Sequence, residues 1–344
     1  WGEGGQYGPA EPVAACVNEI LKERIIGENP LEPVRISEQL YAFSRDFGQK
    51  GTYIEAISAL DIAMWDIAGR YYGQPVARLL GGAYRTEVAA YATGLYYSRK
   101  EYETKTLDTK GVEEEVSRFL STGFNNVKVK IGLLDLEQDV EKIRLVRELI
   151  GEKRGMFVDP NHAYNMTGAK DLLRRIQEYN IGFVEEPLPP EDREGYASLR
   201  QSSSIPIAGG ECEFTAFGFR DLINQRCVDI LQPDLCASGG YSEFIKIRSL
   251  AYANNILLVP HVWGSAVGLS AALQAIAHLP NIPHTALPIP GQNAPMIEFD
   301  QSPNPLRTDI VEEEFRLEDG YLKIPQKPGL GITIKKDGIK EFSR

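Results

Sequence analysis

The chain has 344 residues, 43% of them hydrophobic and 25% charged, which is ample apolar material for one large α/β barrel or two ordinary domains. Its formal net charge of −11 argues against nucleic acid or an anionic membrane as a partner, because either would need a basic patch, whereas a small anionic substrate needs only a local cluster of positive charge. No apolar run of about 18 residues appears, so no membrane-spanning helix is predicted.

The four cysteines, Cys16, Cys212, Cys227 and Cys236, form no CxxC pair and lack zinc-ligand spacing. We therefore expect free thiols in a reducing, cytoplasmic environment. The chain begins at Trp1 without a Met, and we expect further residues to precede it.

The N-terminal part of the sequence predicts helices. Apolar residues recur at helical spacing over residues 11–26, and two prolines open a second segment, 30–47. A third segment, 52–72, has the same spacing, and Gly73 and Pro75 close it.

From residue 88 onward, short apolar runs alternate with longer amphipathic segments. The apolar runs span residues 88–91, 127–131, 156–158, 183–184, 206–208, 230–231 and 257–259. Helix-like segments such as 136–150 and 168–179 lie between them. This alternation predicts a parallel sheet with crossover helices.

A polar residue follows most of the predicted strands. These residues are Asp159, Glu185, Glu211, Asp234 and His261, at intervals of 26, 26, 23 and 27 residues, or about one strand–helix unit each time. Polar groups at successive strand ends converge at the mouth of a (β/α) barrel, where such enzymes work. An open doubly wound sheet would spread them along an edge, and no GxGxxG fingerprint supports it.

Asp159, Glu185 and Glu211 are three carboxylates on consecutive strands, a hard oxygen site suited to Mg²⁺. Such an ion lets a substrate carboxylate accept charge when its α-proton leaves. A single acid at a strand end is usually structural, but three at the same spacing indicate a metal site.

Lys128 and Lys130 lie two apart on one predicted strand and so share a face. Two ammonium groups in one cavity repel, which lowers a lysine pKa towards about 7–8, where the amine can act as a base. The alternative is a solvated edge of lysines. Apolar residues between them favour an inward-facing barrel strand.

His261 has Asp234 on the preceding strand as a partner. An Asp that accepts the Nδ1–H sets the tautomer and favours the imidazolium, so the pair can act as a general base or acid. His162 follows Asp159 by three residues and is predicted to touch the substrate. His278 and His284 have no identifiable partner and are interpreted as structural.

These residues resemble the mandelate racemase subgroup of the enolase superfamily over nearly the whole chain. The motifs are KVKIG at 128–132, VDPNHAY at 158–164, VEEPL at 184–188, GGE at 209–211, QPDLCASGG at 232–240, VPHVWG at 259–264, ALDIAMWDIAGR at 59–70 and PGLGI at 328–332. In this likeness Lys130 is the base of a KxK motif, Asp159, Glu185 and Glu211 are the metal ligands, and Asp234 and His261 form a dyad.

The resemblance implies a (β/α)₇β barrel, a modified TIM barrel, with an α+β capping domain whose first strands precede residue 1. Expected boundaries are 1–85 for the capping domain, 86–300 for the barrel and 301–344 for a segment that returns to the cap. The family also implies a homo-oligomer.

The same likeness adds further site residues. Arg45, Gln49 and Lys50 fall in a cap loop that contacts the distal end of the substrate, and Asn161 would lie beside the metal. The acid after the eighth strand comes late in this sequence, after an insertion, and Glu298 is its best match as an electrophile or general acid.

Four segments look closest to those of cycloisomerases that act on galactarolactone and anhydrogalactonate. They are AYATG, QPDLCASGGYSE, VPHVWGSAVG and IEFDQSPNPLR. In those enzymes α-proton abstraction precedes β-elimination of a ring oxygen. Acid-sugar dehydratases share the catalytic residues and expel a hydroxyl instead. A racemase or epimerase, a muconate-type cycloisomerase and a catalytically silent binding barrel are the alternatives. The muconate type commonly has a lysine where His261 stands, and a silent barrel would have lost a ligand or base.

Overall fold

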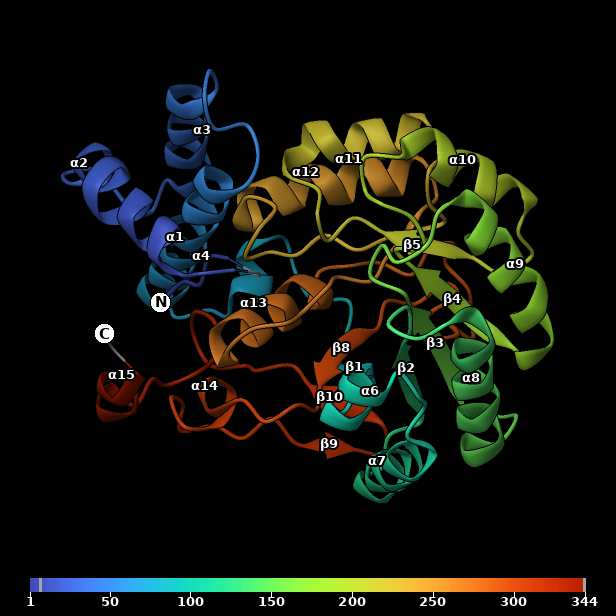
Figure 1. The fold of residues 1–344 in the computed structure, drawn as a ribbon. Helices are drawn as coiled ribbons and strands as arrows, with labels where there is room; N and C mark the ends of the chain where they lie inside the picture. The colour runs from blue at the N-terminus through green and yellow to red at the C-terminus, as the bar shows by residue number, and fades with distance from the viewer. Residues whose placement is uncertain (6–7, 343–344) are drawn as a thin grey trace.

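The computed structural model describes residues 1–5 and 8–342, and its centre is a curved sheet of eight parallel strands wrapped by helices (Figure 1). The strands are β1 (Glu87–Gly94), β2 (Asn126–Lys130), β3 (Gly155–Asp159), β4 (Ile181–Glu185), β5 (Ile207–Gly209), β6 (Ile230–Leu231), β7 (Leu257–Leu258) and β8 (Ile297–Asp300). They pair in chain order from β1 to β7, and β8 pairs in parallel with β1. This return of the last strand to the first is the topology of the predicted (β/α)₇β barrel, not of an open doubly wound sheet.

Each of the first seven strands is followed by helix on the outside of the barrel (Figure 1). These helices are α6 (Arg99–Thr104) and α7 (Thr109–Thr122), α8 (Leu136–Ile150), α9 (Met166–Ile176) with the 3₁₀ turn η2 (Gln177–Tyr179), α10 (Arg193–Ser202), α11 (Thr215–Asn224), α12 (Gly240–Ala253) and α13 (Ala266–Ala277). Helix α8 has the bounds that the sequence predicts, 136–150. Among the described helices, none combines the length and apolar character that a membrane crossing would require.

The side chains of β2 alternate between two buried surroundings. Val127 and Val129 belong to the large apolar cluster between strands and outer helices, whereas the buried Lys128 and Lys130 face the barrel interior. Successive residues of a strand point to opposite faces, and here both faces are covered. The alternation of apolar and charged residues therefore fits a barrel strand whose outer face packs on helices and whose inner face carries the lysines.

A separate apolar cluster fills the barrel interior behind the polar mouth. Its members are Ala89, Tyr91, Phe157, Phe183, Ala208, Ile230, Leu257, Val259 and Met296. The rings of Phe157 and Phe183 stack with centroids 4.2 Å apart, and Tyr91 meets Phe157 edge-on at 5.2 Å. Offset stacking and edge-on contacts are the favoured aromatic geometries, so this cluster forms a packed floor for the site.

The N-terminal part of the chain is helical, as its periodicity predicts. It comprises α1 (Glu11–Ala15), the π-helical η1 (Cys16–Leu21), α2 (Lys22–Ile25), α3 (Pro33–Ser44), α4 (Thr52–Tyr72) and α5 (Val76–Leu79). The first three follow one another without a break and make up the helix expected over 11–26. Helix α4 ends at Gly73, whose φ of 66° is left-handed and suits glycine.

The C-terminal segment connects the N-terminal helices to the barrel. After the short α14 (Pro305–Thr308), strands β9 (Leu317–Glu318) and β10 (Tyr321–Lys323) form a hairpin on β1, and α15 (Lys336–Phe342) follows. Between these elements the Leu330 N–H donates to Asp66 of α4 at 2.8 Å, and the Leu330 carbonyl accepts from Ser270 of α13 at 2.6 Å. These contacts fit a segment that returns to the cap, and the boundaries at 85 and 300 stay a prediction.

Asp61 of α4 is the central polar contact between the N-terminal helices and the barrel. It is fully buried and accepts hydrogen bonds from Ser37 Oγ at 2.7 Å, from the Ser242 backbone N–H at 3.1 Å and from Ser242 Oγ. Burial raises its pKa to about 6, against the opposing effect of these donors. A buried carboxylate is tolerated here because donors from two domains surround it.

We expect Asp61→Ala to lower the free energy of unfolding by about 2–4 kcal/mol, because three buried donors would lose their acceptor. Chemical denaturation at about pH 8, where the carboxylate is ionised, measures the change. Asp46→Ala is the matched control, because Asp46 is exposed, and it should change the free energy by less than about 0.5 kcal/mol. Equal stability of the two variants would mean that Asp61 does not join the domains.

Candidate active site

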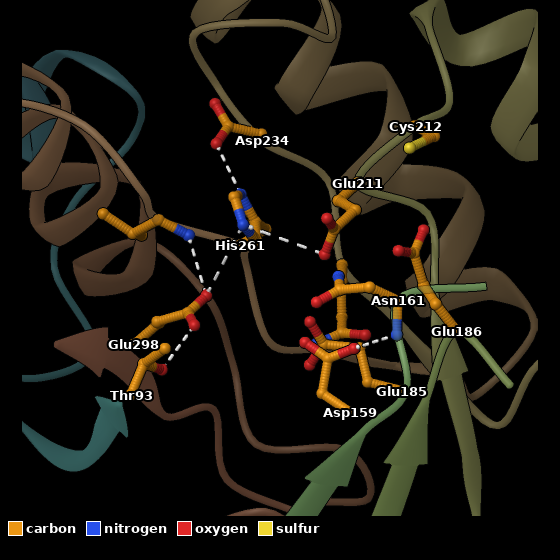
Figure 2. Close-up of polar contacts among 12 residues, drawn as sticks. Thr93, Asp159, Asn161, Glu185, Glu186, Glu211, Cys212, Asp234, His261 and Glu298 are labelled. Carbon is orange, nitrogen blue, oxygen red and sulfur yellow. Dashed lines mark hydrogen bonds and ion pairs between the residues drawn. The ribbon is translucent and has the colours of Figure 1, made fainter. Parts of the chain in front are cut away.

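The polar residues expected at the strand ends meet at the mouth of the barrel (Figure 2). Asp159 and Glu185 are the last residues of β3 and β4, and Glu211, Asp234 and His261 follow β5, β6 and β7 within three residues. Each of the five is no more than 4% exposed. They lie close together because the carboxyl ends of parallel barrel strands open onto one mouth.

Asp159, Glu185 and Glu211 form a buried carboxylate cluster. Lys128 Nζ lies 2.7 Å from Glu185 Oε1 and 3.3 Å from Asp159 Oδ2, and Gln232 Nε2 donates to Glu185 Oε2 at 2.6 Å. Burial, and then the charge of Asp159, raises the pKa of Glu185 well above its ordinary value. Hard oxygen donors that repel one another in this way fit a divalent cation such as Mg²⁺.

Lys128 and Lys130 both reach into the mouth, as their spacing on β2 predicts. Lys130 Nζ donates to Asp159 and, at 2.8 Å, to Asn161 Oδ1. The prediction that mutual repulsion depresses a lysine pKa is wrong for this arrangement. Burial is the largest influence and lowers the pKa of Lys130, but Asp159 and other carboxylates outweigh burial and Lys128, so the net shift is upward. A cation that neutralised Asp159 would remove the main opposing influence.

His261 and Asp234 form the expected dyad. His261 Nδ1 lies 2.8 Å from Asp234 Oδ2, while Nε2 faces Glu211 at 3.8 Å and Glu298 at 3.9 Å (Figure 2). Burial lowers the pKa of His261, but these carboxylates outweigh burial and raise it to about 10. The arrangement therefore favours the imidazolium with its Nε2 proton directed to the mouth.

Glu298 of β8 belongs to the same cluster despite the insertion that precedes it. Its Oε1 lies 2.7 Å from Lys128 Nζ and accepts from Thr93 Oγ1, and its Oε2 accepts from the Val262 N–H at 3.2 Å. Burial raises the pKa of Glu298, but Lys128 and His261 outweigh burial and lower it to about 2. An ionised Glu298 accepts hydrogen bonds, so this arrangement disfavours its predicted role as a general acid.

A cavity of about 310 Å³ opens beside these groups. It is lined by Tyr96, Lys130, Asn161, His162, Glu211, Cys212, His261, Trp263 and Glu298. Asn161 and His162, both expected to contact the substrate or metal region, are thus at its wall. This volume suits a small molecule, and its wall combines cationic, acidic and aromatic groups.

The three cap-loop residues, Arg45, Gln49 and Lys50, are exposed and are not among those that line this cavity. Lys50 Nζ pairs with Glu213 Oε1 at 2.6 Å, and the Arg45 guanidinium lies 5.5 Å from the Tyr41 ring. Their contact with the substrate stays a prediction. The Lys50–Glu213 pair does bring the cap loop to the segment that follows β5.

Sequence reasoning missed Glu186 and Cys212, which lie beside the predicted residues. Glu186 is buried and follows Glu185 directly, and its φ of 42° lies in the left-handed region, so the simple alternation of strand side chains ends there. Cys212 follows Glu211 and lines the cavity. The adjacent acids in VEEPL and the thiol in GECEF were the available signals.

Two family models match the chain and together cover most of it. The mandelate racemase/muconate lactonizing enzyme N-terminal domain matches residues 1–81, and the enolase C-terminal domain-like model matches residues 111–338. These matches correspond to the N-terminal helices and to the greater part of the barrel.

Two characterised relatives align over nearly the entire chain. D-galactarolactone cycloisomerase of Agrobacterium fabrum is 40% identical over 342 residues, covering 99% of this chain and 87% of the relative. Arabinonate dehydratase of Saccharolobus solfataricus is 34% identical over 341 residues, covering 99% of this chain and 86% of the relative.

Two solved structures also match the chain over nearly its whole length. The 3,6-anhydro-D-galactonate cycloisomerase from Zobellia galactanivorans superposes with a TM-score of 0.88 and 36% identity, covering 99% of this chain and 90% of that one. L-talarate dehydratase from Polaromonas, solved with Mg and L-glucarate, superposes with a TM-score of 0.84 and 27% identity, covering 100% of this chain and 88% of that one.

We expect the His261 imidazole of the metal-free protein to titrate near pH 10, as its raised pKa requires. Asp234→Asn should lower that pKa by about 1–2 units, because one contacting opposite charge is removed. NMR of histidine-labelled protein is practical because the chain has 4 histidines. His278, whose pKa burial lowers, serves as an internal reference that the substitution should leave unchanged. An unaltered His261 titration in the variant would contradict the dyad.

Proposed function

Because the chain belongs to the mandelate racemase/muconate lactonizing enzyme family of the enolase superfamily, we propose that it removes the proton α to the carboxylate of a sugar acid or its lactone. In the proposed reaction β-elimination of a ring oxygen follows, so the protein is a Mg²⁺-dependent cycloisomerase of an aldarolactone or an anhydro-aldonate. The observation that carries the proposal is that Lys130 and His261 line one cavity next to three buried carboxylates.

The proposed ligands of Mg²⁺ are Asp159, Glu185 and Glu211. When bound there, Mg²⁺ would supply positive charge to the substrate carboxylate as it takes up electrons. The Asn161 backbone N–H donates to Asp159 Oδ1 at 2.9 Å, which orients that carboxylate. Lys128, in contact with Glu185 and Glu298, offsets negative charge that burial would otherwise make costly.

Lys130 and His261 are the proposed proton-transfer groups, from strands β2 and β7. One of them takes the α-proton, and the electrons of the broken C–H bond move into the carboxylate to form an enediolate. Return of those electrons breaks the C–O bond at the β-carbon, and the departing oxygen takes a proton from the group on the other side. The group that takes the α-proton has to start neutral, and the group that protonates the departing oxygen has to start protonated. If Lys130 is the base, it therefore has to lose its proton first.

His261 is well suited to the acid part of this scheme. Asp234 holds its Nδ1 at 2.8 Å, which leaves Nε2 directed to the cavity. Glu298 lies 3.9 Å from that nitrogen and, as an ionised carboxylate, is proposed to stabilise the imidazolium and not to act as the electrophile or general acid. Asn161 and His162 line the cavity and are proposed to contact the substrate, with Arg45, Gln49 and Lys50 reaching its distal end when the loop closes.

A sugar-acid dehydratase is the second candidate, because it needs the same enediolate and expels a hydroxyl instead of a ring oxygen. The 34% identity to an arabinonate dehydratase supports it. The higher identities to two cycloisomerases, 40% and 36%, favour the cycloisomerase. A racemase or epimerase uses the same two bases without elimination. A silent barrel is disfavoured because all the proposed ligands and bases are retained.

We also propose that the enzyme is cytoplasmic and forms a homo-oligomer. The free thiols Cys16, Cys212, Cys227 and Cys236 suit a reducing compartment. The oligomer is an expectation from the family alone.

The proposal is tested by incubating the protein with Mg²⁺ and a panel of aldarates, aldonates and their lactones in D₂O, followed by NMR and mass spectrometry. We expect one lactone or anhydro acid to give an isomeric keto acid that carries deuterium at the former β-carbon, where the enol left by the elimination takes up a solvent proton, and that has otherwise unchanged composition. A keto acid formed with loss of water would establish the dehydratase instead. An absence of turnover and of deuterium exchange over the panel would contradict both.

Two variants assign the proton transfers in this assay. Lys130→Ala should slow α-proton exchange on one face by at least about 100-fold, and His261→Asn should do so on the other. Lys110→Ala, at a lysine whose side chain is 83% exposed, is the matched control and should be as active as the parent. Exchange that survives in Lys130→Ala would remove Lys130 as a base.

Glu211→Gln should weaken Mg²⁺ binding by at least about tenfold, because a charged oxygen ligand is replaced by a neutral one. Isothermal titration of the metal-free protein with Mg²⁺ measures the affinity directly and does not require a substrate. Glu191→Gln, at an exposed position, should bind Mg²⁺ like the parent. Equal affinity in both variants would exclude Glu211 as a ligand.

A further inference from the structure

A second group of metal-binding side chains lies beside the proposed Mg²⁺ ligands and has no part in the proposed proton transfers. His162, Glu186 and Cys212 come from the segments after β3, β4 and β5. One ligand atom from each, a ring nitrogen, a carboxylate oxygen and a sulfur, lies within 4.8 Å of the other two. In Figure 2 the labelled Glu186 and Cys212 lie on the side of the site away from His261, whereas Glu211 turns towards His261.

We infer that His162, Glu186 and Cys212 form a binding site for a transition-metal dication of the Zn²⁺ type, separate from the carboxylate cluster. His162 Nε2 lies 3.7 Å from Cys212 Sγ and 3.1 Å from Glu186 Oε2. Ligands bound tetrahedrally to zinc at about 2.0–2.3 Å are separated by roughly 3.3–3.6 Å. The two separations from His162 are therefore close to this spacing, and the Glu186 and Cys212 ligand atoms lie within 4.8 Å of each other.

The orientation of His162 supports this assignment. Its Nδ1 lies 3.4 Å from the Leu188 carbonyl oxygen, which leaves Nε2 to face Glu186 and Cys212. A metal-bound histidine characteristically directs its other ring nitrogen to a carboxylate or a backbone carbonyl, because that contact sets the tautomer and the ring plane.

Glu186 provides the second observation. Its side chain is 2% exposed, and Oε2 makes no hydrogen bond with any residue that the structure describes, although it points at His162 Nε2. A buried carboxylate oxygen without a donor is costly, and a shared cation is one of the few groups that would compensate it. Among the described residues Glu186 forms no salt bridge with a lysine or arginine, and its contact with His162 is an ion pair only when the imidazole is protonated.

The mixture of ligand types decides the class of ion. Thiolate and imidazole ligands select Zn²⁺ and related borderline ions, whereas Mg²⁺ takes oxygen ligands almost exclusively. Three protein ligands leave one position for water or another small ligand, as in open zinc sites. His162 and Cys212 also line the cavity, so that position would face the space proposed for the substrate.

The test uses Co²⁺ as a spectroscopic substitute for Zn²⁺, added to the intact protein in the presence of saturating Mg²⁺. We expect a thiolate-to-cobalt absorption band in the near ultraviolet that reaches its maximum at one equivalent and disappears when Zn²⁺ is added. The carboxylate cluster has no sulfur ligand, so cobalt bound there would give no such band. The readout is independent of activity and of the identity of the substrate.

Three variants make the assignment specific. Cys212→Ser should abolish the band, and His162→Ala should weaken cobalt binding by about tenfold or more. Cys227→Ser is the matched control, because Cys227 is also a free thiol, and it should retain the band. Absence of the band in the parent protein, or its survival in Cys212→Ser, would overturn the proposal. Circular dichroism of each variant confirms that a lost band does not result from unfolding.

Discussion

The dominant constraint on this structure is the burial of many carboxylates at one end of a barrel. The mouth contains the acids Asp159, Glu185, Glu186, Glu211, Asp234 and Glu298, and the bases Lys128, Lys130 and His261. Buried charges are tolerated only when opposite charges or metal ions compensate them. The acids outnumber the bases, so a site of this composition favours cations. The excess of acids also explains why Lys128 contacts three carboxylates at once, from three different strands.

The remainder of the fold holds these charges in place against their mutual repulsion. The stacked rings of Phe157 and Phe183 form a rigid apolar floor directly behind the charged residues of the same strands. Polar contacts such as that of Asp61 with Ser242 then attach the N-terminal helices to helix α12 of the barrel. The packed interior below the mouth excludes water from that side, which strengthens the electrostatic interactions of the buried charges.

The cavity has two histidines whose surroundings assign them different tasks. His261 is held by Asp234 through Nδ1 and presents Nε2 to carboxylates that raise its pKa to about 10, which suits proton transfer. His162 has Nδ1 near a backbone carbonyl and Nε2 near Glu186 and the Cys212 thiol, which suits a metal ligand. The two histidines thus differ in chemistry because their ring nitrogens have different partners.

The sequence by itself determined the barrel and the positions of its strand-end acids, because side-chain alternation and strand–helix length are local properties. Helices 52–72 and 136–150 and the groups Asp159 to His261 follow from that periodicity. Only the tertiary structure decided the direction of the Lys130 pKa shift, since it depends on the sum of burial and charges from several strands. It also decided that Glu298 joins the cluster across an insertion, that the cap loop lies outside the cavity lining, and that Cys212 meets His162. Those outcomes depend on contacts between residues far apart in the chain, which no local pattern records.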